Sequence, residues 1–180
     1  MAIKTASGFD LRNSLSSGLV LLNTTSFSAV ASQAVNTVFS ATYNNYKILI
    51  NITASTADGS LLLRLRNGTT DKATNYIYAM YGRQSTSGGV VSASSTSTGL
   101  YLQDIDSTAT YFGMSMDLLN PFNTTKTIAL QQQLIKATDG NDYHTNISTY
   151  QTEDYSADGV NLIVGAGAIT GTISVYGYNK

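Results

Sequence analysis

The chain has 180 residues, of which only 12% are charged, and a formal net charge of −1. Soluble domains usually carry roughly 25% charged residues, and here Ser, Thr, Asn and Gly fill the difference. The Lys and Arg residues are scattered, so the sequence offers no basic stripe for nucleic-acid phosphates and we expect no nucleic-acid partner. The absence of cysteine excludes disulfides and thiolate metal sites.

The N-terminus has no signal-peptide apolar core, and no apolar run approaches the roughly 20 residues that cross a bilayer. We therefore expect a protein that is made in a cytoplasm without a cleaved signal and has no membrane partner. The chain is long enough for one domain with a proper core. A surface of hydroxyls and amides, with 12 Tyr and no Trp, is typical of extracellular or virion β-proteins.

Residues 1–18 carry widely spaced apolar residues among polar residues and single charges. This is too little apolar surface for a core, so the sequence predicts an N-terminal arm. Two alternatives remain open: the arm docks on a partner chain and attaches the protein, or it lies along its own sheet. The candidate attachment residues are Ile3, Phe9, Leu11 and Leu15.

The clearest strand signal is the isoleucine-rich run at residues 47–53, which follows a turn rich in Asn. Apolar and polar residues alternate along it, and one face carries Tyr46, Ile48, Ile50 and Ile52. The strands expected in chain order span residues 19–27, 47–53, 61–66, 75–81, 100–105, 109–119, 127–135, 143–150, 160–164 and 169–178.

No stretch shows the i, i+3, i+4, i+7 pattern of a helix at length. Residues 85–99 are rich in Ser, Thr and Gly and predict a long loop with at most a weak strand at Val90 and Val91. Eight or more regularly spaced strands, separated by turn residues, predict an all-β antiparallel β-sandwich over residues 19–180. A jelly roll is the favoured version of this sandwich.

The residues that carry acid-base or metal chemistry are few and dispersed. His144 is the only histidine and is expected on the surface. Asp104 and Asp106 lie on the same side of a short strand, where a solvated edge is favoured over a cation site. A glycosidase needs two positioned carboxylates, and the 11 acidic residues are spread along the chain. We expect a protein that is not an enzyme and holds no metal or cofactor.

Four tyrosines near the Ser/Thr/Gly-rich segment have two interpretations. Aromatic rings with hydroxyl tips fill cores and subunit interfaces, and they also stack on sugars. The core or interface interpretation is favoured, while a glycan site beside an adaptable Ser/Thr/Gly segment is the alternative. The residues are Tyr76, Tyr78, Tyr81 and Tyr101.

Three segments of the chain resemble β-sandwich modules in structural proteins of tailed bacteriophages, including phages of marine cyanobacteria. These segments are VFSATYNNYKILI at residues 38–50, LRLRNG at 63–68 and ITGTISVYGY at 169–178. Together they frame the chain from about residue 20 to the C-terminus, and they bring no catalytic residues with them.

The resemblance implies a virion protein, made in the host cytoplasm and often trimeric, whose partners are its own copies and other virion proteins. Capsid decoration, knob and tail fibre are the placements it implies. The alternative function is a receptor-binding module that recognises host surface glycan during host attachment.

Overall fold

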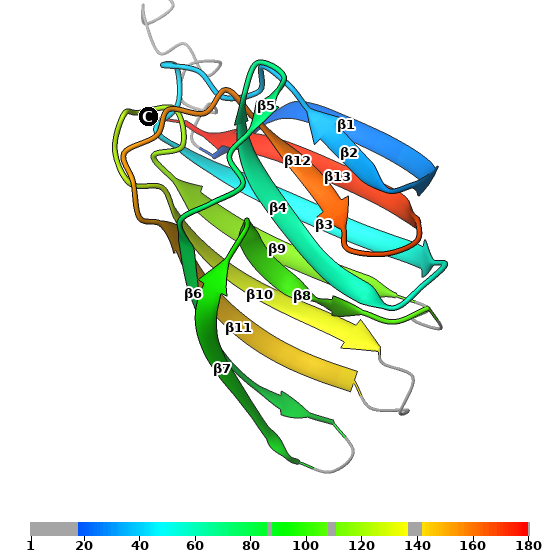
Figure 1. The fold of residues 1–180 in the computed structure, drawn as a ribbon. Coiled ribbons are helices and arrows are strands. Elements are labelled where there is room, and N and C mark those ends of the chain that lie inside the picture. The colour runs from blue at the N-terminus through cyan, green and yellow to red at the C-terminus, as the bar shows by residue number, and fades with distance from the viewer. Residues whose placement is uncertain (1–17, 86–87, 108–110, 137–141, 180) are drawn as a thin grey trace, which may run out of the picture.

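The computed structural model describes residues 18–85, 88–107, 111–136 and 142–179, and these residues form two packed antiparallel sheets with no helix (Figure 1). The larger sheet has the order β1-β13-β3-β9-β10-β11-β6-β7. Its strands are β1 (Leu19–Val30), β13 (Ile169–Tyr178), β3 (Asn45–Ser55), β9 (Phe112–Leu119), β10 (Ile128–Lys136), β11 (Asp142–Gln151), β6 (Tyr76–Gln84) and β7 (Val90–Ser97). The smaller sheet comprises β2 (Ser32–Val35), β12 (Gly159–Val164), β4 (Gly59–Asn67), β5 (Thr70–Asp71) and β8 (Leu100–Ile105), with β5 and β8 both paired to β4.

Four antiparallel pairs are nested in the sequence and alternate between the two sheets: β1 with β13, β2 with β12, β3 with β9, and β4 with β8. This is the path of one long ribbon folded over on itself, which gives the strand order of a jelly roll. The predicted all-β sandwich is confirmed. Strands β6 and β7 come between β4 and β8, while β10 and β11 follow β9, and all four extend the larger sheet.

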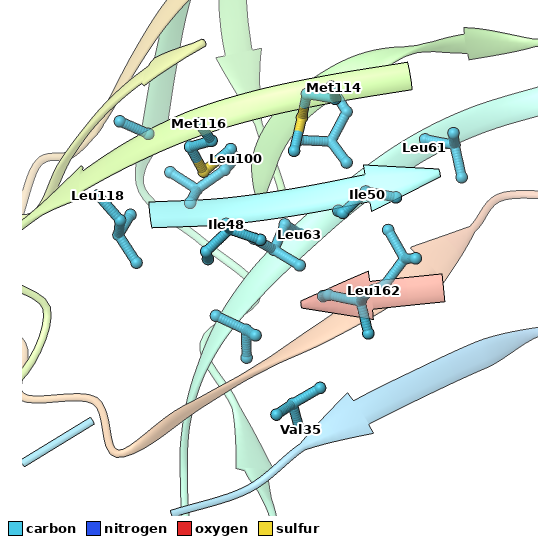
Figure 2. Close-up of a cluster of buried hydrophobic side chains, with 14 of the residues drawn as sticks. Val35, Ile48, Ile50, Leu61, Leu63, Leu100, Met114, Met116, Leu118 and Leu162 are labelled. Carbon is cyan, nitrogen blue, oxygen red and sulfur yellow. The ribbon is translucent and has the colours of Figure 1, made fainter. Parts of the chain in front are cut away.

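The core lies between the sheets and is centred on β3, whose predicted inward face is confirmed. Figure 2 shows side chains of β3, β4, β9 and β12 meeting there. The Tyr46 hydroxyl donates to the carbonyl of Ser40 at 2.9 Å and accepts from its N–H at 2.8 Å, which fixes the corner before β3. The buried residues of β3 are Tyr46, Ile48, Ile50 and Ile52.

The prediction of a long loop at residues 85–99 is wrong, because Val90–Ser97 forms strand β7. This strand pairs with β6 from Tyr76 opposite Ser97 to Arg83 opposite Val90, without a register shift. Ser and Thr give little hydrophobic signal, and the backbone hydrogen bonds to β6 define this strand instead. Figure 1 shows β6 and β7 as a long hairpin that reaches away from the sandwich.

Candidate functional site

Tyr76 is a core residue and does not belong to a surface site. Its side chain is fully buried, and its hydroxyl donates to the carbonyl of Lys72 at 3.0 Å and accepts from the N–H of Leu65 at 3.2 Å. Burial raises the pKa of the Tyr76 hydroxyl because the phenolate would lose its hydration.

Tyr78 and Tyr101 lie against each other where β6 of the larger sheet passes β8 of the smaller one. Their rings are stacked, with centroids 4.5 Å apart and an interplanar angle of 25°. Burial, followed by the nearby Asp104 carboxylate, raises the pKa of Tyr101. One face of each ring packs against the other ring, so the pair connects the two sheets. The stacking leaves only the opposite ring faces available to a sugar.

Tyr81 lies on the opposite side of β6, on the face of the larger sheet that is turned away from the smaller sheet. We call this the outer face. The Tyr81 side chain is 57% exposed and lies opposite Asn146 of β11. Of the four tyrosines singled out from the sequence, Tyr81 is therefore the one best placed for an external ligand.

Two glutamines of β10 cover the free edge of β8. The Gln131 amide donates to the carbonyl of Tyr101 at 2.5 Å, and the Gln133 amide donates to the carbonyl of Leu102. These contacts occupy the unpaired carbonyls of an edge strand. The inner side of β10 and β11 is correspondingly polar. Five residues in this region have a buried side-chain oxygen without a hydrogen-bond partner: Thr127, Gln131, Gln133, Thr145 and Thr149.

A polar hollow of about 300 Å³ lies on the outer face over β3, β9, β10 and β11. In it, Lys47 Nζ lies 3.0 Å from Asp117 Oδ1, and the Tyr178 hydroxyl donates to the same carboxylate. Sequence reasoning missed this group, because Lys47 and Asp117 are 70 residues apart and meet only through the pairing of β3 with β9. Side chains that line the hollow include Lys47, Ser115, Asp117, Gln132, Asn146 and Ser148.

An apolar hollow of about 360 Å³ adjoins the polar one on the outer face. It lies across β10, β11 and β6, and Ser148 lines both hollows. One charged residue, Lys126, lies among its lining residues. The apolar lining comes from Ile77, Ala79, Ile128 and Tyr150.

Within the described parts of the chain, no three His, Asp or Glu side chains lie close enough together to hold a metal ion. His144 is exposed on β11, as predicted, and Asp104 is exposed on β8. None of the described residues belongs to a helix that is long and apolar enough to span a membrane. Four predicted attachment residues, Ile3, Phe9, Leu11 and Leu15, lie outside the described residues.

Comparison with protein-family models found no match, and no curated protein matches the sequence.

Proposed function

We propose that this protein is a non-enzymatic structural protein of a tailed-phage virion, a jelly-roll module that assembles as a small homo-oligomer on the capsid or tail. The three segments that resemble phage modules include most of β3, part of β4 and all of β13. These strands belong to the nested pairs of the jelly roll, so the resemblance concerns the strands that define its topology. The same resemblance favours a trimer.

The observation that carries the oligomer proposal is the free edge of β7. Natural sheets protect their edges, because unpaired N–H and C=O groups are a template for another strand. Here β1 has two register shifts, β2 is four residues long, and β8 is covered by glutamine amides. By contrast, β7 has eight residues, no charge and a regular register, and among the strands that the structure describes it is paired on one side only. We infer that a neighbouring copy covers it.

The test is the mass of the purified protein by light scattering. We expect an oligomer, and we expect Ser95→Lys to reduce the mass, because a Lys side chain on a strand edge opposes pairing. Ser26→Lys on the irregular edge strand β1 is the matched control and should keep the wild-type mass. A wild-type protein that is monomeric at every concentration would disprove the oligomer.

Placement on the virion needs a separate experiment. Density for the jelly roll in an image reconstruction of the intact particle would distinguish capsid from tail. Absence of the protein from purified particles would contradict the virion proposal and leave the measured oligomeric state unaffected.

The second candidate function is recognition of host surface glycan, and the polar hollow favours it. Amide and hydroxyl groups beside a charged pair suit the many hydroxyls of a sugar, and the exposed Tyr81 ring lies next to Asn146 at the rim. Binding on a glycan array that is lost in Asn146→Ala and weakened in Tyr81→Ala would support this function. Ser92→Ala on β7 is the control, and binding that survives both test variants would exclude this hollow.

A further inference from the structure

The polar hollow lies along a row of side chains that crosses the strands of the larger sheet. The register places Gln132 of β10 opposite Ser115 of β9 on one side and opposite Asn146 of β11 on the other. Asn146 in turn lies opposite Tyr81 of β6, and Ser115 lies opposite Leu49 of β3. Residues that lie opposite each other share a face of the sheet, so all five side chains belong to the outer face. We call these five residues the cross-strand row.

The two amides at the centre of the cross-strand row are available to a ligand. On the inner side of β10, the amides of Gln131 and Gln133 donate to carbonyls of β8. The side chains of Gln132 and Asn146 are exposed instead, and neither makes a hydrogen bond within the described residues. Each carboxamide has two donor hydrogens and one acceptor oxygen. Two adjacent amides can therefore bind several hydroxyl groups of one ligand.

Apolar surface lies beside these amides. Leu130 lines the hollow and is exposed, and the two ends of the cross-strand row are formed by the exposed side chains of Tyr81 and Leu49. A sugar ring carries hydroxyls around its edge and C–H groups on its faces, so it needs hydrogen-bonding groups and apolar or aromatic surface next to each other. The hollow supplies both.

The cross-strand row is longer than one sugar ring and is open at both ends. From β3 to β6 it spans four strand spacings, or about 19 Å at about 4.8 Å per spacing. One spacing is close to the length of one hexose unit, so a chain of about four units fits across these strands. Beyond the row, Ser174 lies opposite Leu49 and Ser92 lies opposite Tyr81. These small side chains leave room for a longer chain to continue in both directions.

The charges of the hollow cancel each other. Lys47 and Asp117 are the charged residues among those that line it, and Lys47 Nζ lies 3.0 Å from Asp117 Oδ1. The Tyr178 hydroxyl also donates to this carboxylate. A charged sugar would have to compete with one member of the ion pair for the other and would meet a like charge beside it. An uncharged sugar leaves the pair intact.

The neighbouring cations do not change this balance. Arg83 lies opposite His144, two residues along the strands from the cross-strand row, and its guanidinium donates to the carbonyl of Gly88 at 3.1 Å. Lys126, at the apolar hollow, lies 3.7 Å from the carboxylate of Asp154. Neither cation supplies a free positive charge to the row.

We propose that the cross-strand row binds an internal segment of an uncharged linear polysaccharide. The chain lies across the strands, with its hydroxyls on Gln132 and Asn146 and one sugar ring on Tyr81. This inference rests on the glycan-recognition function proposed above and specifies the class of glycan. The free amides select hydroxyl groups, the open ends select a chain, and the closed ion pair selects against charge.

Titration calorimetry with the purified protein tests the class of ligand. The probes are the neutral chains β-glucan, mannan and dextran and the acidic chains alginate and polygalacturonate. We expect binding to a neutral chain and to neither acidic chain. Fragments of the bound chain should bind more tightly as they lengthen to about four units and no further, because the row spans that many strand spacings. Gln132→Ala should weaken binding about three- to tenfold through the lost hydrogen bonds, whereas Thr172→Ala, on the outer face of β13, is the control.

A second variant tests the role of the ion pair. Asp117→Asn leaves Lys47 without its carboxylate partner and should give binding to alginate that the wild-type protein lacks. Binding of an acidic chain by the wild-type protein would overturn the uncharged ligand and leave glycan recognition standing. Equal affinity for one sugar unit and for four would overturn the placement of a chain across the strands. Failure to bind any of the five polysaccharides would overturn the inference, and the glycan array then decides separately whether the hollow recognises glycan at all.

Discussion

At the scale of single residues, Gly171 shows how closely the backbones of β13 and β3 approach. It lies at the register shift between these strands, and a Cβ there would be 2.1 Å from the carbonyl oxygen of Asn51. Gly113, on β9, would place its Cβ in open space. The two glycines therefore form a matched pair, because the substitution is the same and only the surroundings differ.

We predict that Gly171→Ala lowers the free energy of unfolding by about 1–3 kcal/mol, because the added methyl group must displace backbone. Gly113→Ala should change it by less than about 0.5 kcal/mol, as expected for a surface site. Urea denaturation of the two variants measures both values. Equal losses would show that the close contact at Gly171 relaxes without penalty.

At the scale of strands, β10 shows where alternation in the sequence is informative and where it is ambiguous. In β3 the apolar face is the buried face, and a sequence pattern is enough to predict it. In β10 the buried face carries Gln131 and Gln133, while Ile128 and Leu130 are 40% and 47% exposed. The strand that lies opposite determines which face of β10 is polar, because the free carbonyls on the edge of β8 need hydrogen-bond donors. A sequence pattern cannot show which strand will lie opposite.

We predict that Gln133→Ala destabilises the protein by about 1–3 kcal/mol, because the carbonyl of Leu102 loses its donor in a buried place. Gln132→Ala, one residue away on the outer face, should have little effect on stability. Thermal unfolding compares the two variants, and amide hydrogen exchange should show faster opening of β8 only in Gln133→Ala. Unchanged exchange in β8 would mean that the glutamine does not protect this edge.

At the scale of the whole molecule, the sequence predicts the sandwich but not its extension. Turn residues and alternating strands are local features, and they are sufficient to predict an all-β antiparallel sandwich, of which a jelly roll is the favoured version. The extension of the larger sheet depends on pairs such as β6 with β11, which run from Gln84 opposite Tyr143 to Tyr76 opposite Gln151 and so join strands far apart in the sequence. The polar hollow and the apolar hollow arise from the same long-range register, so neither can be predicted from local sequence.

The whole molecule should also lose stability in alkaline solution, because burial raises the pKa of several tyrosines above the ordinary value of 10.0. Burial and the hydrogen bond to Asp117 raise the pKa of Tyr178 to about 12, and burial raises the pKa of Tyr46 as well. The folded protein therefore keeps protons that the unfolded chain releases, so the stability is fully present below pH 10 and falls between pH 10 and about 12. Urea denaturation across this range, with phenolate absorbance as the titration signal, should show the decline, and Tyr178→Phe should make it shallower. A stability that stays constant from pH 10 to pH 12 would contradict the assigned shifts.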